Sequence, residues 1–182
     1  MKVDLSKYRN KEFQPGSFLK RGTWYFINLI FFNSGFFPFY WLKTFLLKLF
    51  GSTIGKNIFI KPNVNIKYPW RLNIGNNVWI GEGVWIDNLN QMQIGNNVCI
   101  SQGAMLISGN HNYKSTTFNL ITKPIILEDG VWIGAKSIVV GGVIAKSHSV
   151  LTVGSVATND LTAYSINKGN PAIKIKNREI LS

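Results

Sequence analysis

The sequence repeats itself at two spacings, and this regularity limits the fold more than any other feature. IGNNV stands at 74–78 and again at 94–98, twenty residues later. Within this region an aliphatic residue recurs every six positions, and after an interruption the same spacing resumes from Leu127 to Ala157. Repeats this short cannot fold alone, so they must stack and bury one another's apolar face. Three tandem units of twenty residues lie at 54–73, 74–93 and 94–113.

Each six-residue repeat has the composition of a short strand followed by a turn. A large aliphatic residue such as Ile80 or Ile86 begins the repeat, and a smaller one such as Val84 stands two positions before the next. Alternation along a strand would point the large residue inward and leave the smaller one to fill a corner. Gly, Asn and Asp between the strands suit tight turns that need positive φ. Three such repeats close one triangular coil of about eighteen residues, which predicts an all-β fold, a parallel β-helix.

An apolar residue precedes most of the inward-facing ones, so alternation turns it toward the outside of the coil. Such an apolar exterior is a liability on a monomer. We therefore expect it to pack against another subunit or beneath the N-terminal segment. Cys99 belongs to this set and is interpreted as a packed small apolar group rather than a nucleophile. The full set is Phe59, Trp79, Trp85, Cys99, Met105, Trp132, Ile138, Ile144, Val150 and Val156.

A segment of different composition precedes the repeats. Residues 18–50 are apolar and aromatic, and the stretch from Thr23 to Leu42 carries no charge. The sequence NSG at 33–35, followed by Pro38, predicts a break between two short helices. Three arrangements stay open: a helical hairpin that covers one end or side of the repeats, an element in the plane of a membrane surface, and a membrane span.

We divide the chain into an N-terminal helical segment, a β-helix domain with an excursion loop, and a C-terminal tail. The chain holds 20 Lys and Arg against 8 Asp and Glu, a formal charge of +12, so we expect an anionic partner such as a nucleotide-like cofactor or a membrane surface. The basic residues are scattered and form no recognised module, which argues against nucleic acid. The charged N-terminus does not resemble a secretory signal, so we expect a cytoplasmic protein, peripheral to the inner face of the membrane if 18–50 contacts it. The boundaries are 1–50, 51–160 with its loop at 108–124, and 161–182.

Four blocks of sequence carry a family resemblance. They are GEGVWIDNL, IGNNVCISQGAMLISGNHNY, KPIILEDGVWIGAKSIVVGGV and SINKGNPAIKIK. In this order they resemble the hexapeptide-repeat acyltransferases of the left-handed parallel β-helix fold, and more narrowly the colanic-acid-type sugar O-acetyltransferases. The resemblance extends over most of the chain, including the apolar N-terminal segment. It implies a left-handed β-helix, a homotrimer, acetyl-CoA as co-substrate and a sugar or glycan acceptor.

The one interruption of the repeat, at 108–124, holds His111, one of only two histidines. A long excursion from a regular solenoid is usually functional or disordered. An imidazole titrates near neutrality and can remove a proton from an alcohol as the oxygen attacks a thioester. In the resembled family the histidine in a Gly-Asn-His setting is the general base, so the resemblance assigns this role to His111.

The resemblance also implies residues for the two substrates. Asp87 and Asn88 interrupt the repeat one coil before the base, where relatives place polar side chains that contact the acceptor; capping of a turn by this pair is the alternative. On the acetyl-CoA side, small residues let a pantetheine arm pass close to the backbone, and two lysines reach the phosphates or form a solvated tail. Asn159 departs from the Lys or Arg often found in relatives, and Ile173 replaces another basic position. The acetyl-CoA set is Gly134, Ala135, Val153, Gly154, Thr158, Asn159, Lys174 and Lys176.

The function that the sequence favours is acetyl-CoA-dependent O-acetylation of a sugar hydroxyl in a surface polysaccharide or its precursor, with His111 as the base. The alternative is a non-catalytic β-helix that serves as a binding or scaffold protein. Loss of the loop histidine would mark such a protein, and here that histidine is present. A metalloenzyme of the γ-carbonic-anhydrase type needs several histidine ligands, which two histidines cannot easily supply. No metal is therefore expected.

Overall fold

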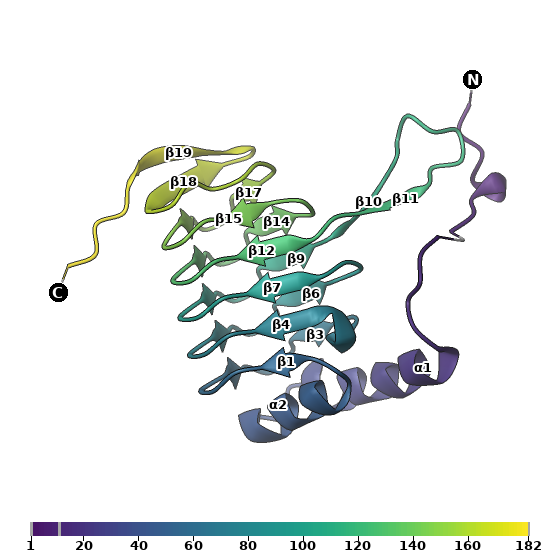
Figure 1. Cartoon of the computed structure of the whole chain (residues 1–182), viewed down its shortest axis with the longest axis horizontal. Helices are drawn as coiled ribbons and strands as arrows, with labels where there is room; N and C mark the ends of the chain where they lie inside the picture. Colours follow the sequence, from purple (N-terminus) through teal and green to yellow (C-terminus); the bar gives the residue numbers. More distant parts are fainter. Residues whose placement is uncertain (1, 11, 182) are drawn as a thin grey trace.

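The computed structural model describes residues 2–10 and 12–181. A short 3-10 turn, η1 (Leu5–Lys7), precedes the helices α1 (Phe18–Ile27), η2 (Asn28–Phe32) and α2 (Tyr40–Leu49), of which η2 continues α1 as a π-helical turn. From residue 53 onward the chain winds into a β-helix of about six turns (Figure 1). Its elements are β1 (Thr53–Ile54), β2 (Phe59–Ile60), β3 (Asn65–Ile66), η3 (Pro69–Arg71), β4 (Leu72–Ile74), β5 (Trp79–Ile80), β6 (Trp85–Asp87), β7 (Met92–Ile94), β8 (Cys99–Ile100), β9 (Met105–Ile107), β10 (Gly109–His111), β11 (Leu120–Thr122), β12 (Ile125–Leu127), β13 (Trp132–Ile133), β14 (Ile138–Val140), β15 (Ile144–Ala145), β16 (Val150–Leu151), β17 (Val156–Ala157), β18 (Ser165–Gly169) and β19 (Ala172–Asn177).

Three sheets form the three sides of the coil. Sheet A has the order β1-β4-β7-β12-β15, sheet B the order β19-β18-β16-β13-β8-β5-β2, and sheet C the order β17-β14-β9-β6-β3. Successive coils stack in register, so that Ile60 pairs with Ile80 and Ile80 with Ile100. These residues are completely buried, as the six-residue spacing requires. The predicted fold, a left-handed parallel β-helix of hexapeptide repeats with an N-terminal helical segment, is confirmed.

The repeated IGNNV sequence has two physical causes. Asn77 and Asn97 both occupy the left-handed region, with φ of 56°, where Asn is tolerated better than most residues. Their amides form a ladder across coils, since Nδ2 of Asn77 donates to Oδ1 of Asn97 over 3.0 Å. A Cβ on Gly75 would lie 2.8 Å from the carbonyl oxygen of Gly95 in the next coil. The motif thus combines a turn that accepts positive φ with a glycine that lets adjacent coils approach.

The N-terminal helices cover the end of the β-helix that holds β1 (Figure 1). The first coil there would otherwise leave its backbone groups without partners, and an open edge of this kind invites aggregation. The indole Nε1 of Trp24 donates to the carbonyl of Ile66 over 2.7 Å, and Nζ of Lys43 donates to the carbonyl of Lys61 over 2.9 Å. Phe32 is completely buried beside these contacts. The helices therefore cap the solenoid through both packing and hydrogen bonds.

Of the three arrangements expected for 18–50, the structure has the helical hairpin that covers one end. The break at 33–35 is present, between η2 and α2. Within 2–10 and 12–181, none of the helices has the length and apolar character that crossing a bilayer requires. The membrane-surface alternative concerns the outer side of the same hairpin, which is considered below.

The segment at 161–182 was expected to be a tail, but much of it continues the fold. β18 pairs in parallel with β16, and β19 turns back antiparallel to β18. Asn167 is buried, and its Nδ2 donates to the carbonyl of Val150 over 3.1 Å and to Oγ of Ser165 over 2.8 Å. This hairpin is not a hexapeptide coil, so the six-residue spacing gives no sign of it.

Candidate active site

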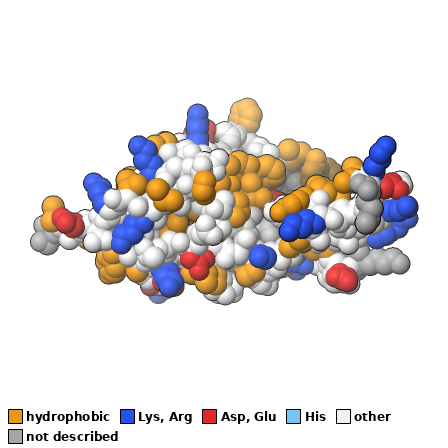
Figure 2. All heavy atoms as spheres, turned by 90° about the horizontal axis from the view of Figure 1, so that it is seen from above, with side chains coloured by type: hydrophobic (Ala, Val, Ile, Leu, Met, Phe, Trp, Pro, Cys, Tyr) orange, Lys and Arg blue, Asp and Glu red, His pale blue; other side chains and the backbone are white. Residues whose placement is uncertain are grey.

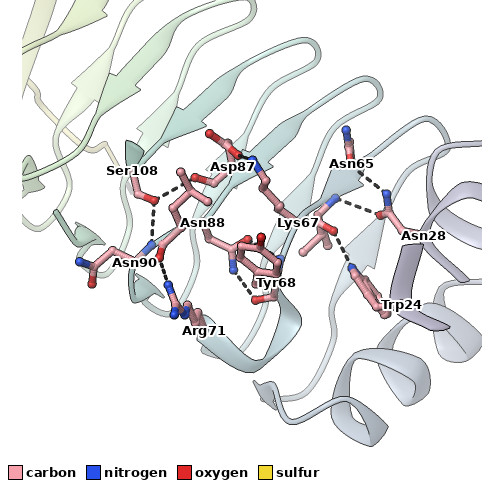
Figure 3. A network of polar contacts seen from close by, with 12 residues as sticks. Trp24, Asn28, Asn65, Lys67, Tyr68, Arg71, Asp87, Asn88, Asn90 and Ser108 are labelled. Atoms are coloured by element: carbon pink, nitrogen blue, oxygen red, sulfur yellow. Dashed lines mark hydrogen bonds and ion pairs between the residues drawn. The ribbon is translucent and has the colours of Figure 1, made fainter. Parts of the chain in front are cut away.

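The side chains expected to contact the acceptor gather at one edge of the β-helix, where sheet C turns into sheet A. Asp87 ends β6, and the excursion that holds His111 leaves one coil later, after β9. The register places Asp87 beside Ile107. Oγ of Ser108 donates to the backbone carbonyl of Asp87 over 2.9 Å, and the same oxygen accepts a hydrogen bond from the backbone N–H of Asn90. Figure 3 shows these polar groups joined in one network. This edge is called the acceptor corner below.

The excursion is a β-hairpin with an ordered tip. β10 pairs antiparallel with β11, and Figure 1 shows the hairpin reaching away from the solenoid. At the tip, Oγ1 of Thr117 donates to Oδ1 of Asn119 over 2.6 Å and lies 2.8 Å from Oγ of Ser115. Phe118 adopts a φ of 51°, which is uncommon for a bulky residue and turns its carbonyl back toward β10. The hairpin therefore presents that carbonyl to His111.

The contacts of His111 determine which ring nitrogen can act as a base. Nδ1 lies 2.8 Å from the carbonyl oxygen of Phe118. Since a carbonyl can only accept, Nδ1 carries the proton in this contact, and Nε2 of the neutral ring keeps a free lone pair. The imidazole stacks on the ring of Phe118 with 4.5 Å between centroids and 7° between planes, and the ring of Tyr8 lies at 5.9 Å. The ring is thus held in one orientation.

A cavity of about 280 Å³ lies beside this histidine. Two of its lining residues, Lys114 and Lys123, bring positive charge, and Tyr113 is largely exposed at its edge. Cationic groups near a hydroxyl favour its deprotonated form and stabilise an oxyanion. The lining residues are Ser108, Asn110, His111, Asn112, Tyr113, Lys114, Ile121 and Lys123.

Asp87 has a carboxylate with hydrogen-bonding capacity to spare. The residue is only 9% exposed, and its Oδ1 lies 3.0 Å from Nζ of Lys67 (Figure 3). Beyond this ion pair, Oδ1 receives no hydrogen bond from the described residues. Oδ1 is itself shielded from solvent, so a hydroxyl of a ligand would meet this carboxylate at Oδ2.

Asn88 has no such capacity. It is completely buried, and both ends of its amide contact the backbone of Tyr68: Oδ1 accepts from the N–H over 2.9 Å, and Nδ2 donates to the carbonyl over 2.6 Å (Figure 3). These bonds connect the turns of two successive coils. The geometry of Asn88 matches the turn-capping alternative, whereas Asp87 faces the acceptor corner.

A larger cavity, of about 480 Å³, lies between α1 and the first coils and was not foreseen from the sequence. Arg21 and Lys67 bring positive charge to it, and Trp85 and Tyr25 contribute aromatic surface. Nε of Arg21 is buried without a hydrogen-bond partner among the described residues. The sequence could not indicate this cavity, because it depends on where α1 lies against sheet C.

Half of the residues expected to bind acetyl-CoA lie at another corner, where sheet B turns into sheet C. A Cβ on Gly134 would lie 2.6 Å from the backbone nitrogen of Val153, so the stacking of coils alone requires glycine there. Gly154, with a φ of +67°, faces open space, and Val153 is exposed. The backbone N–H of Gly154 donates to the carbonyl of Ala135 over 2.9 Å. This part of the set is Gly134, Ala135, Val153 and Gly154.

The other expected acetyl-CoA residues lie elsewhere. Thr158 and Asn159 are exposed at the C-to-A edge, the same edge as His111, and Lys174 and Lys176 are exposed on β19. Within one chain, sheet C separates the B-to-C corner from the acceptor corner. The structure of a single copy therefore does not bring Val153 and Gly154 together with His111.

Most of the outward apolar residues form two stacks, one on sheet B and one on sheet C, while Ile144 lies on sheet A. On sheet B, Cys99 lies between Trp79 and Trp132 in the register, and on sheet C Trp85 pairs with Met105. The corresponding positions of sheet A are polar in the first three coils, with Thr53, Asn73 and Gln93, and apolar in the next two, with Ile126 and Ile144. Burial raises the pKa of the Cys99 thiol, which keeps it protonated and unsuited to nucleophilic attack.

Comparison with known proteins gives the family. The sequence matches no protein-family model. It is 33% identical over 176 residues to the "Putative colanic acid biosynthesis acetyltransferase WcaF" of Escherichia coli (strain K12), a match that covers 96% of this chain and 97% of that protein. The protein of the same name from Shigella flexneri matches equally.

Solved structures agree in fold. The hexapeptide-repeat-containing acetyltransferase VCA0836 of Vibrio cholerae O1 biovar eltor, in complex with acetyl coenzyme A, gives a TM-score of 0.79 at 22% identity and covers 89% of this chain and 88% of that one. The maltose O-acetyltransferase of Clostridium difficile 630 gives 0.76 at 22% identity, with the same coverage. Because the WcaF match spans nearly the whole of both chains, this chain belongs to the hexapeptide-repeat acetyltransferase family.

Proposed function

We propose that this chain is an acetyl-CoA-dependent O-acetyltransferase that acts on a sugar hydroxyl of a surface polysaccharide or its precursor, with His111 as general base. The observation that carries the proposal is the contact between Nδ1 of His111 and the Phe118 carbonyl, which leaves Nε2 free. Support for the substrates comes from the name of the WcaF relative and from a structural neighbour that holds acetyl coenzyme A.

The chemistry follows from that tautomer. Nε2 of His111 takes the proton of the sugar hydroxyl as its oxygen attacks the thioester carbonyl. The carbonyl of Phe118 holds Nδ1–H and stabilises the imidazolium that forms. When the C–S bond of the tetrahedral intermediate breaks, the proton passes from Nε2 to the leaving sulfur, so that the products are an acetyl ester and a free thiol. No covalent acyl-enzyme is needed, which is consistent with the protonated state of Cys99.

Asp87 is proposed to contact the acceptor. Its carboxylate accepts a hydrogen bond from a hydroxyl next to the reacting one, and Lys67 holds the carboxylate in place through their ion pair. Asn88 is a positioning residue that fixes the backbone of the acceptor corner through Tyr68.

The active site is proposed to lie between subunits of a homotrimer. The acceptor corner and the B-to-C corner are separated within one chain, and the apolar stacks on sheets B and C supply surface for neighbouring copies. Val153 and Gly154 of one copy then face His111 of the next, with the pantetheine arm between them. Gly154 fits this role because nothing lies within 4 Å of a Cβ built on it. Lys174 and Lys176 are exposed and free to contact phosphates.

The test is acetyl transfer from labelled acetyl-CoA to a panel of sugars and glycan fragments, with wild type beside His111→Ala. Loss of the base is expected to lower kcat by about a hundredfold or more, while the affinity for acetyl-CoA stays the same. Equal rates in the two proteins would contradict the role of His111. Failure of the wild type to bind acetyl-CoA would favour the scaffold alternative.

A further inference from the structure

The helices that cap the β-helix carry large apolar side chains on their outer side. Phe26 is 62% exposed, Trp41 is 70% exposed and Phe45 is 56% exposed, although helices of soluble domains usually turn such residues inward. Only Lys48 interrupts this surface on α2. We call it the end face; its exposed apolar residues are Leu19, Phe26, Ile30, Phe36, Phe39, Trp41, Phe45 and Leu49.

The helices and the first coil, which form this end of the molecule, contain basic residues and no acidic one. Between Glu12 and Glu82 the sequence has no acidic residue, while it has eight basic ones. On the opposite side, which Figure 2 views from above, acidic and basic side chains are interspersed. Lys67 is paired with Asp87 and Lys43 is buried, so the end face combines aromatic side chains with the positive charge of the remaining six. The eight basic residues are Lys20, Arg21, Lys43, Lys48, Lys56, Lys61, Lys67 and Arg71.

We propose that the end face docks on an anionic lipid bilayer, with the β-helix standing on the membrane. Tryptophan favours the headgroup region of a bilayer because its ring is apolar and carries one polar N–H, and phenylalanine inserts at the boundary with the acyl chains. Lysines beside them attract anionic lipid. α1 and α2 have ten residues each, about 15 Å, so they lie in the plane of the interface rather than across it.

A second copy of this chain fits the end face less well. Two end faces in contact would bring together two sets of basic residues, of which only Lys67 has an acidic partner among the described residues, and such like-charge contacts oppose association. The apolar stacks on sheets B and C lie on the sides of the β-helix and remain available for neighbouring copies. A lipid surface with negative headgroups is the occupant that matches both the apolar area and the charge.

Docking in this way would place the catalytic hairpin at a fixed height. The hairpin that holds His111 leaves the third coil of the β-helix, and the helices lie beneath the first coil. Two spacings between coils and the thickness of one helix layer together place the base of the hairpin about 20 Å above the lipid surface. The cavity between α1 and sheet C lies along this path and ends at Lys67, the partner of Asp87. An acceptor attached to the membrane would reach His111 along the side of the molecule.

The experiment is co-sedimentation of the whole protein with vesicles of phosphatidylcholine, with and without phosphatidylglycerol. The variant Phe26→Ser/Trp41→Ser/Phe45→Ser removes exposed side chains of the end face, and Ile175→Ser/Ile180→Ser is the matched control at the opposite end of the chain. We expect wild type and control to bind only the vesicles with phosphatidylglycerol, and more weakly at high salt. The triple variant should lose at least about tenfold in apparent affinity.

Two results would overturn the proposal: wild type that stays in the supernatant with phosphatidylglycerol vesicles, or a triple variant that binds as wild type does. A triple variant with a smaller mass in solution than wild type would assign the end face to a second copy instead. Acetyl transfer to a soluble glycan fragment is measured in parallel and should be equal in all three proteins. Failure of the proposed chemistry is thereby distinguished from failure of docking.

Discussion

At the acceptor corner, two adjacent polar residues have different environments. The carboxylate of Asp87 has one partner among the described residues, Lys67, whereas both ends of the Asn88 amide are bonded to the backbone of Tyr68. The sequence marks both positions because they break the repeat, but it cannot say which side chain points outward. Side chains alternate between the two faces of β6, but β6 ends at Asp87. The direction of the next side chain therefore cannot be read from the alternation.

This difference predicts that one substitution affects catalysis and the other affects stability. Asp87→Asn keeps the shape of the side chain but removes its charge, and should lower kcat/KM for the sugar acceptor by about 10- to 100-fold with no change in the KM of acetyl-CoA. Asn88→Ala should instead lower the free energy of unfolding by about 1–3 kcal/mol, because the N–H and carbonyl of Tyr68 lose their partners. Steady-state kinetics and denaturant unfolding separate the two, and an Asp87→Asn enzyme with unchanged kinetics would remove this residue from the site.

Helix α2 supplies a buried lysine to the open end of the β-helix. Lys43 is 1% exposed, and its Nζ donates to the carbonyls of Ile60 and Lys61; within 2–10 and 12–181 it forms no ion pair with a carboxylate. Burial lowers the pKa of Lys43 from its ordinary value of 10.5 to about 8. Near neutral pH the buried charge therefore lowers the stability of the folded state, although its hydrogen bonds offset part of this cost.

The sign of the resulting pH dependence follows from linkage. Between the lowered folded pKa and the ordinary unfolded one, the unfolded chain binds more protons, so stability rises as pH increases from about 8 to 10.5. The gain is at most about 3 kcal/mol. Lys43→Met removes this contribution. The free energy of unfolding of wild type, measured in urea, should therefore increase relative to that of the variant as the pH rises. A difference that is constant with pH would contradict the lowered pKa.

At the scale of elements, the sequence predicted those parts of the fold that repeat. The six-residue spacing predicted the coils, and NSG at 33–35 predicted the break between the helices. The hairpin β18–β19 was missed because it closes sheet B without following that spacing. The excursion at 108–124 was recognised as an interruption, but the bond between His111 and Phe118 depends on an antiparallel pairing and a positive φ that no motif encodes.

At the scale of the whole molecule, the separation of the two corners makes the trimer testable by complementation. His111→Ala disables the acceptor corner, and Val153→Glu places a charged side chain at the B-to-C corner where the pantetheine arm would lie; each protein alone should be inactive. If each site uses His111 from one subunit and Val153 from the next, assemblies formed by equal co-expression should recover about a quarter of wild-type activity, since half of the subunits are intact at each corner. The mass in solution should be that of three chains. A stable monomer, or mixtures that stay inactive, would place both halves of the site within one chain.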